Sequence, residues 1–134
     1  MTEYSRSPAG AWLNGVLQSV EPGRLTATYL VRPEMANPAG ILHGGMASTM
    51  LDDIMGLTVY SLEKESFFAT VSLNVDFLGN VRVGDTVTAT AEVVKSGRSV
   101  VFMQSTLHDA EGKLLVKSNS NLAAAAHYKV LNRS

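Results

Sequence analysis

The segment from Asn37 to Glu63 constrains the fold of this chain most strongly, because its pattern predicts a glycine-bearing turn followed by one long helix. Apolar side chains occupy 9 of the 15 positions from Met46 to Tyr60, so we expect much of this helix to be buried. Asp52 and Asp53 stand in its middle, and burying an unpaired carboxylate is energetically unfavourable. One of the two aspartates is therefore a candidate for chemistry.

The composition excludes several classes of function. The 134 residues suffice for one domain, which we expect to span residues 1–134, and 46% of them are hydrophobic. A net charge of −1 gives no electrostatic basis for binding nucleic acid, and the lack of cysteine excludes disulfides and thiolate metal sites. The sequence has neither a signal-peptide core nor an apolar run of about 20 residues. We therefore expect a soluble, cytoplasmic protein without a membrane partner.

Alternating and β-branched runs predict an antiparallel sheet around the helix. One strand precedes the helix and four follow it in meander order, at residues 24–31, 67–78, 86–94, 99–108 and 113–124. Residues 8–17 are predicted to form a short amphipathic helix. The predicted fold class is α+β, with a long central helix wrapped by an antiparallel sheet of about five to six strands. Because this layout leaves open strand edges and a half-covered helix, we expect at least a homodimer.

The run at residues 67–78 alternates regularly between apolar and polar side chains. Val71, Leu73 and Phe77 are predicted to share one face of the strand, and Thr70 is predicted to point from the opposite, polar face. The strand is therefore expected to be half-buried.

Four residues around the predicted helix start are candidates for binding or positioning. Gly44 and Gly45 could offer backbone N–H groups and the positive end of the helix dipole to a carbonyl oxygen, or could simply form a tight turn. For His43 we favour a positioning role, because no histidine pair has helical metal-ligand spacing and no metal site is expected. Asn37 is either a turn former or an amide donor directed at a carbonyl.

Helical geometry distinguishes the two aspartates. Asp52 shares its stripe with mainly small residues, which leave room for a substrate, whereas Asp53 shares its stripe with larger side chains. This favours Asp52 as the catalytic carboxylate; in the alternative, Asp52 faces solvent and Asp53 is paired inside. Gly45 lies roughly 10 Å from Asp52 along the helix at about 1.5 Å per residue, too far for one carbonyl to contact both. We therefore expect the glycine donors and the carboxylate to come from two chains packed antiparallel across a dimer axis.

The sequence N-P-A-G-I-L-H-G-G, followed by an aspartate nine residues after the histidine, resembles the PaaI-like (phenylacetic acid degradation) group of hotdog-fold acyl-CoA thioesterases. The similarity covers most of the chain, including the G-D-T-V turn at residues 84–87 and the S-G-R turn before the fourth strand. The resemblance implies hydrolysis of an acyl-CoA thioester without metal or organic cofactor, CoA being part of the substrate. It also implies a homodimer with the active site across its interface, usually paired into a homotetramer.

The same resemblance assigns roles by position. Asp52 matches the catalytic carboxylate, which acts as nucleophile or as base on water, and Gly44 matches the glycine whose N–H polarises the thioester. Asn37 matches an asparagine near the attacking water or the thioester, and His43 a histidine that orients the site. Thr70 falls where relatives place a hydroxyl that helps to position water.

A second set of residues is implied to bind the substrate. Gly45 supports Gly44, while Lys95 and Arg98 are candidate partners for the CoA phosphates or ordinary surface cations. Asp53 departs from the family pattern, since relatives usually have a neutral residue there. We expect Asp53 to point elsewhere or to be paired, because two carboxylates buried together repel each other.

Two other functions stay open at this point. A hotdog enoyl-CoA hydratase or dehydratase would need a catalytic histidine paired with a carboxylate, whereas His43 precedes the helix in a glycine turn. A non-catalytic acyl-CoA binding or sensing module would use the same pocket without releasing a thiol. The acyl group is also open, because the candidate pocket residues either line an apolar pocket or belong to the core; they are Met46, Met50, Met55, Leu57, Phe67 and Phe68.

Overall fold

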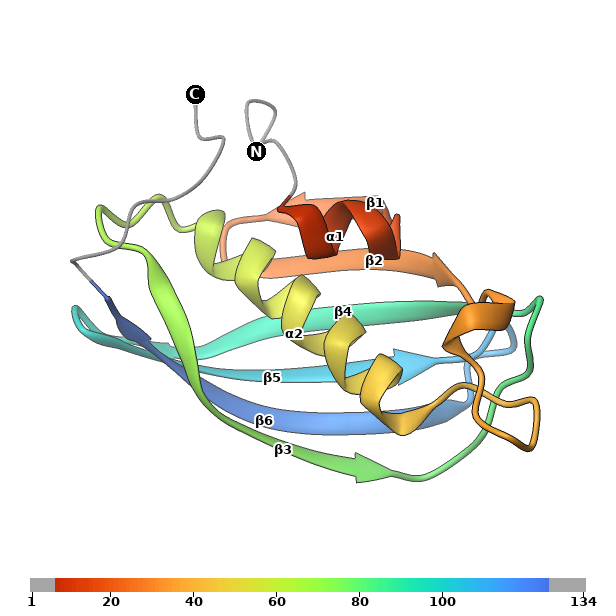
Figure 1. Ribbon diagram of the computed structural model, residues 1–134. Helices are drawn as coiled ribbons and strands as arrows, with labels where there is room; N and C mark the ends of the chain where they lie inside the picture. Colours follow the sequence, from red (N-terminus) through yellow and green to blue (C-terminus); the bar gives the residue numbers. More distant parts are fainter. Residues whose placement is uncertain (1–6, 126–134) are drawn as a thin grey trace.

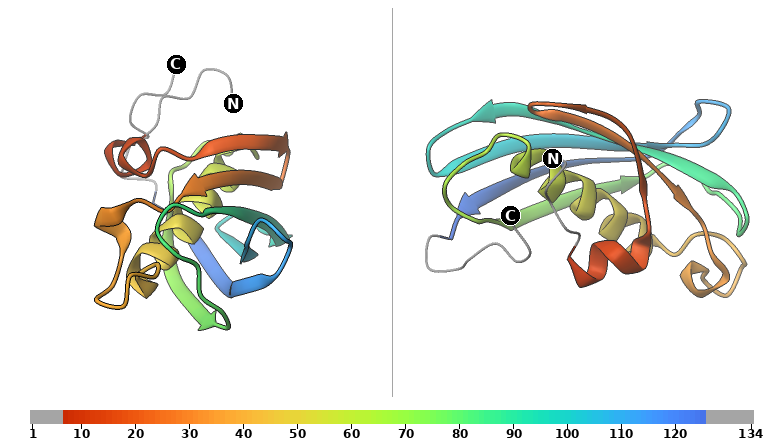
Figure 2. Two further views of the ribbon diagram at one scale, coloured as in Figure 1. Left: turned by 90° about the vertical axis from the view of Figure 1, so that its right-hand side faces the viewer. Right: turned by 90° about the horizontal axis from the view of Figure 1, so that it is seen from above.

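The computed structural model describes residues 7–125, and Figure 1 shows an antiparallel sheet that curves around a long helix, α2. Seen along other directions in Figure 2, the sheet covers α2 from one side, and the short helix α1 lies on the same side of the sheet as α2. The predicted α+β layout is thereby confirmed. In chain order the elements are α1 (Pro8–Leu13), β1 (Val16–Glu21), β2 (Arg24–Leu30), the 3₁₀ helix η1 (Pro33–Met35), α2 (Gly44–Tyr60), β3 (Phe68–Phe77), β4 (Thr86–Ser96), β5 (Val100–His108) and β6 (Leu114–Ala124).

The strands follow the order β1-β2-β4-β5-β6-β3, with every neighbouring pair antiparallel. The predicted meander is therefore wrong for β3, which lies at one edge beside β6 and does not pair with β4. The connection at residues 78–85 is held at both ends, because the Leu78 N–H donates to the Leu115 carbonyl and the Gly84 N–H to the Val31 carbonyl. Alternation indicates which face a side chain occupies but not which strand lies beside it, so it could not predict this order.

The chain before β2 also differs from the prediction. Helix α1 ends at Leu13 and not at residue 17, because Asn14 adopts a left-handed conformation with φ of 55° and caps the helix. Val16–Glu21 then forms the edge strand β1, which pairs with β2. At the junction, a Cβ added to Gly15 would come within 2.5 Å of a ring carbon of Tyr29. Only glycine fits between the end of α1 and this buried ring.

A β-bulge in β3 changes the face on which Thr70 lies. Thr70 pairs with Leu122 of β6, and Ser72 pairs with the residue next to Leu122, so Val71 is an extra residue between them. Thr70 therefore shares the helix-facing side with buried Leu122 and with Leu73, which packs against the core. The predicted regular alternation, with Thr70 and Leu73 on opposite faces, is wrong here because the extra residue shifts the two-residue period by one.

The core lies between α2 and the inner face of the sheet. Met50, Leu51, Ile54 and Met55 of α2 are completely buried, which confirms the expected burial of the helix. Burying each such side chain contributes roughly 1.5–3 kcal/mol to folding. Met50 and Met55 thus belong to the core.

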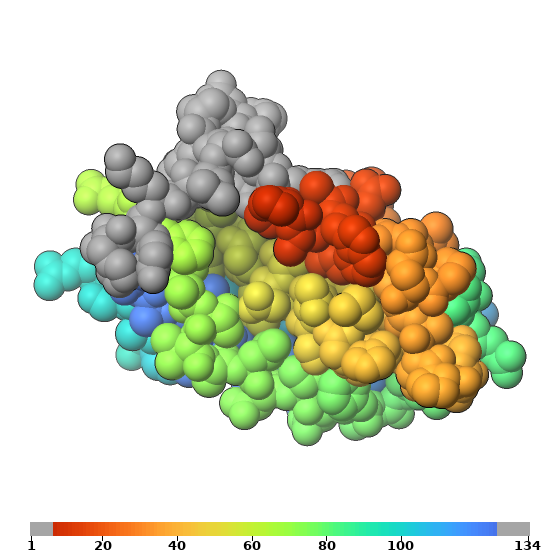
Figure 3. Space-filling view, in the orientation of Figure 1, coloured from red at the N-terminus to blue at the C-terminus, as the bar shows by residue number. Residues whose placement is uncertain are grey.

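One side of α2 stays uncovered within the described chain. The space-filling view in Figure 3 shows atoms of α2 between α1 and β3. Gly45, Asp52 and Gly56 are exposed along this helix, at positions that fall on one stripe. The predicted stripe of small residues around Asp52 therefore faces out of the chain.

Candidate active site

The two adjacent aspartates of α2 have different partners. The Tyr29 hydroxyl, on a side chain that is 1% exposed, donates to Asp53 Oδ2 over 2.7 Å. The Thr70 hydroxyl of β3 donates to Asp52 Oδ1 over 2.6 Å on the exposed side of the helix. The expectation that Asp53 points elsewhere or is paired is confirmed, and within one chain the two aspartates adopt the arrangement given above as the alternative, with Asp52 exposed and Asp53 bonded to a hydroxyl. Asp52 is the carboxylate that the chain presents outward, and its catalytic role stays a prediction.

His43 is the N-cap residue of α2. Its Nδ1 accepts a hydrogen bond from the Gly45 N–H over 2.8 Å, and its own backbone N–H donates to the Met35 carbonyl over 2.8 Å. The imidazole therefore acts as a cap that fixes the start of the helix, in agreement with the positioning role inferred for it. The N–H of Gly45 is occupied by this bond, whereas Gly44, as the first helical residue, has no intrahelical acceptor for its N–H.

Asn37 organises the loop that leads into α2. Its side-chain oxygen accepts hydrogen bonds from the N–H groups of Ala39 and Ile41, over 2.9 and 3.4 Å. The turn-forming interpretation of Asn37 is thus observed. Because the oxygen faces the loop, the side-chain NH2 of Asn37 stays available as a donor, and Asn37 lines the same pocket as Gly44.

The ring of Phe77, at the end of β3, lies beside Gly44. A Cβ added to Gly44 would come within 3.3 Å of two ring carbons of Phe77. Close contact with the ring is therefore a second reason for glycine at this position, besides access of a ligand to the backbone. Sequence reasoning treated Phe77 only as an apolar strand residue, and no spacing signal linked it to the start of α2.

The predicted site residues fall into three groups in a single chain. Asn37, His43, Gly44 and Gly45 gather at the start of α2, while Asp52 and Thr70 meet near its middle. Because α2 is continuous from Gly44 to Tyr60, the first two groups are separated by roughly 10 Å of helix, as the sequence predicts.

The third group, Lys95 and Arg98, is exposed around the β4–β5 turn. Lys64, which follows α2, donates from Nζ to the Gly97 carbonyl over 3.0 Å and so ties this turn to the C-terminal end of the helix. In Figure 1 this turn lies at the opposite end of the molecule from the start of α2. Within one chain these cations are therefore remote from Gly44.

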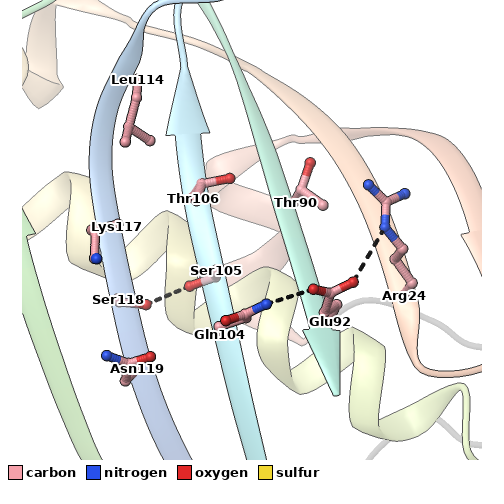
Figure 4. A pocket seen from close by; sticks show the side chains of 10 residues that line it. All are labelled: Arg24, Thr90, Glu92, Gln104, Ser105, Thr106, Leu114, Lys117, Ser118 and Asn119. Atoms are coloured by element: carbon pink, nitrogen blue, oxygen red, sulfur yellow. Dashed lines mark hydrogen bonds and ion pairs between the residues drawn. The ribbon is translucent and has the colours of Figure 1, made fainter. Parts of the chain in front are cut away.

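A larger hollow of about 320 Å³ lies on the other face of the sheet, away from α2. Figure 4 shows its polar lining from β2, β4, β5 and β6, in which Glu92 accepts a hydrogen bond from Gln104 and pairs with Arg24. Ser105 and Ser118 bond to each other beneath it. None of the predicted site residues lines this hollow, so the candidate active site stays on the helix side.

Residues 7–125 contain neither a group of candidate metal ligands nor a membrane-spanning helix. In this range no three histidine, aspartate or glutamate side chains are placed to hold a metal ion. No helix in the same range is long and apolar enough to cross a bilayer.

Known proteins share this architecture. Residues 39–116 match the family model described as the thioesterase superfamily. Acyl-coenzyme A thioesterase 13 of Homo sapiens is 29% identical over 102 residues, which cover 75% of this chain and 73% of that protein. The structure of a phenylacetic acid degradation-related protein of Ralstonia eutropha is 29% identical, with a TM-score of 0.81 and coverage of 90% of this chain and 92% of that chain.

A further similar structure contains coenzyme A. It is that of a hypothetical thioesterase protein of Streptococcus pneumoniae, which is 25% identical with a TM-score of 0.79. The match covers 87% of this chain and 89% of that chain. Together with the strand order, these similarities confirm the hotdog fold expected from the sequence.

Proposed function

Because the chain belongs to the thioesterase superfamily, we propose that it hydrolyses acyl-CoA thioesters to a free acid and CoA at a site shared between two subunits. The similarity to an acyl-coenzyme A thioesterase and to a coenzyme A-bound structure supports this substrate class. The observation that carries the proposal is the hydrogen bond from Thr70 to Asp52 on the uncovered side of α2, while Asp53 is held separately by Tyr29. One positioned carboxylate is thereby left for chemistry.

The reaction uses an N–H donor and a carboxylate. The thioester oxygen accepts a hydrogen bond from the Gly44 N–H at the positive end of the helix dipole, which stabilises the negative charge that develops on it. Asp52 accepts a proton from water while the water oxygen bonds to the thioester carbon; the C–S bond then breaks, and the CoA sulfur takes up the proton. The Thr70 hydroxyl holds one oxygen of Asp52, leaving the other to face the water. CoA enters with the substrate, and no metal or organic cofactor takes part.

The shared site follows from the separation of these groups along α2. Gly44 and Asp52 lie too far apart on one helix to contact the same carbonyl. β3 is an edge strand, and exposed apolar side chains cluster on it and beside its ends, namely Phe67, Val71, Phe77 and Leu78. Pairing of two β3 edges across a two-fold axis covers this apolar surface and sets the two α2 helices antiparallel. Gly44 of one subunit then faces Asp52 of the partner subunit.

The CoA moiety extends from this shared site toward a charged turn. An acyl-CoA held between the two subunits can direct its phosphates along α2 to the β4–β5 turn, where Lys95 and Arg98 are exposed. Both cations lie beyond the C-terminal end of α2, where Lys64 anchors the turn through Gly97. In this proposal Lys95 and Arg98 contribute to substrate affinity and not to the chemical step.

The proposed assembly is a homodimer, and the family resemblance further implies pairing of two dimers into a homotetramer. The proposed location is the cytoplasm, with which a chain of 134 residues without cysteine is compatible. Neither the homotetramer nor the location is needed for the chemistry, whereas the homodimer is.

A hydratase or dehydratase fits the site less well. Such an enzyme needs a histidine that exchanges protons with the substrate, but Nδ1 of His43 already accepts the Gly45 N–H as a helix cap. A binding module without catalysis is the second alternative, and it predicts saturable acyl-CoA binding with no thiol release.

Substitution of the outward carboxylate tests the function. Asp52→Asn should lower the rate of thiol release from acyl-CoA by about 10²–10⁴ with little change in fold, because it removes the base and keeps the shape. Asp53→Asn is the matched control and should keep most of the turnover, since Asp53 is held by Tyr29. Near-normal turnover in Asp52→Asn would contradict the proposed function. A single turnover in ¹⁸O-labelled water shows whether the product oxygen comes from water directly or from Asp52 acting as nucleophile.

Subunit mixing tests the shared site. Gly44→Pro removes the N–H donor at the first helical position, where the helix backbone accommodates proline, and the 56% exposed Phe77 ring must shift to make room for it. A dimer that combines one Gly44→Pro subunit with one Asp52→Asn subunit has one intact site and one doubly defective site. Mixing the two inactive variants should therefore restore about one quarter of the wild-type activity, because half of the dimers are hybrids with one working site each. If each chain held a complete site, mixing would restore nothing.

A further inference from the structure

A pocket beside Gly44 is lined mostly by apolar side chains together with Asn37 and Asn80, and it adjoins the N–H group assigned to the thioester oxygen. It has a volume of about 170 Å³ and lies between the start of α2, the end of β3 and the ends of β5 and β6. Building on the proposed thioesterase function, we propose that this pocket receives the acyl group and limits it to a compact group of about six carbons, such as a single ring.

The position of the pocket relative to Gly44 indicates which half of the substrate enters it. A thioester whose oxygen accepts the Gly44 N–H has its acyl group and its CoA sulfur on opposite sides of the carbonyl carbon. The buried side chains that line the pocket, among them Ala47, Leu107 and Leu115, are apolar, whereas the pantetheine arm of CoA carries amides that need hydrogen-bond partners. The apolar acyl group therefore fits the pocket, and the CoA arm leaves along the surface.

The floor of the pocket determines how long the acyl group can be. Leu107, Leu115 and Val116 form the floor from β5 and β6, and their exposed fractions are 0%, 1% and 3%. These side chains belong to the core, so the pocket cannot deepen without disturbing it. An apolar protein cavity of about 150 Å³ holds one benzene molecule, which makes the pocket large enough for one ring and too small for a long fatty acyl chain.

Ala47 limits the pocket on the side of α2, and Phe77 limits it on the outer side. Ala47 is buried in the second turn of α2, so a larger side chain there fills the pocket from the helix side. Phe77 is 56% exposed and packs its ring beside Gly44, so it forms the outer wall. Removing the Phe77 ring widens the pocket toward the subunit interface proposed above without leaving a hole in the core of the chain.

A series of acyl-CoA substrates tests the size limit. In the wild type, kcat/KM for thiol release should rise about fourfold for each added CH2 from acetyl-CoA to hexanoyl-CoA, and should stop rising or fall by dodecanoyl-CoA. Benzoyl-CoA should be accepted as well as hexanoyl-CoA. A rise that continues through dodecanoyl-CoA would overturn the inference.

Two variants and a control locate the pocket. Ala47→Leu should lower the ratio of hexanoyl-CoA to acetyl-CoA hydrolysis at least about tenfold, and Phe77→Ala should raise the ratio of dodecanoyl-CoA to hexanoyl-CoA hydrolysis. Phe102→Ala is the matched control, since Phe102 is 47% exposed and lies on β5 outside the pocket; both ratios should stay at wild-type values. If Ala47→Leu fails to fold, the ratio of dodecanoyl-CoA to hexanoyl-CoA hydrolysis in Phe77→Ala tests the inference without it. Unchanged ratios in Phe77→Ala would overturn the inference.

Binding measurements separate this inference from the thioesterase proposal. Absence of thiol release from every acyl-CoA would contradict the thioesterase function but not the pocket. Calorimetric titration with alkyl-CoA thioethers, which cannot be hydrolysed, would then show the same length limit if the pocket binds the chain. Equal affinity for ethyl-CoA, hexyl-CoA and dodecyl-CoA would contradict the pocket whether or not the protein hydrolyses thioesters.

Discussion

Replacement of Tyr29 by phenylalanine tests the separation of the two adjacent aspartates. The Tyr29 hydroxyl donates to Asp53 Oδ2 over 2.7 Å, and the tyrosine is 1% exposed. Tyr29→Phe keeps the ring that packs against Gly15 and removes the hydroxyl alone. The variant therefore weakens the anchoring of Asp53 without touching Asp52 or Thr70.

The expected loss of stability follows from the type of hydrogen bond. A hydrogen bond to a charged group contributes about 1.5–3 kcal/mol, and the carboxylate of Asp53 is only partly buried. We expect Tyr29→Phe to lower the free energy of unfolding by about 1.5–2 kcal/mol. Turnover at 25 °C should fall by less than about threefold, because the outward carboxylate keeps its Thr70 partner.

A double-mutant cycle measures the interaction itself. Urea unfolding of Tyr29→Phe, Asp53→Asn and the double variant, all at one protein concentration, yields the coupling free energy between the two side chains. We expect a coupling of at least about 1 kcal/mol. A coupling below about 0.5 kcal/mol, or a loss of turnover in Asp53→Asn as large as in Asp52→Asn, would refute the assignment of Asp53 to structure and Asp52 to chemistry.

Two further predictions concern the site and the packing. Thr70→Val removes the hydroxyl that holds Asp52 Oδ1 and keeps the side-chain shape, so kcat should fall about 10- to 100-fold while the urea midpoint stays nearly unchanged; equal losses in midpoint and turnover would assign Thr70 to folding instead. Gly15→Ala should destabilise the fold by about 1–3 kcal/mol, because the added Cβ meets the Tyr29 ring. Gly56→Ala should instead stabilise the fold by roughly 0.5–1 kcal/mol, because the added Cβ in the middle of α2 meets nothing within 4 Å. Urea unfolding gives the free energy of unfolding of both glycine variants, and a change of the same sign in both would contradict the packing described.

The site residues illustrate what can be predicted from local spacing. The start of α2 at Gly44, the outward stripe around Asp52 and the distance between the two all follow from the helical repeat, and the structure agrees with each. For His43 the sequence predicted only a positioning role, and the structure shows that the imidazole caps α2 through the Gly45 N–H. These features depend on neighbours within about two turns of helix, so the sequence contains the information needed for them.

Other features could not be predicted, because they depend on contacts between distant segments. The bulge at Val71 turns Thr70 toward α2, and nothing in the alternation of that strand signals an extra residue. The partner of Asp53 is Tyr29, 24 residues away, and the ring that covers Gly44 comes from Phe77. Each of these contacts exists only once the sheet has closed around the helix.

By itself the sequence determined a buried helix, an adjacent pair of carboxylates, a glycine turn at the helix start, and a spacing that one chain cannot use as a complete site. The tertiary structure decided which strand neighbours which, which aspartate is held by Tyr29, and where a pocket adjoins Gly44. The physical reason is the separation along the chain over which each effect acts. Helical periodicity acts between residues three to seven positions apart, whereas strand order and side-chain pairing depend on which distant segments bury their apolar faces together.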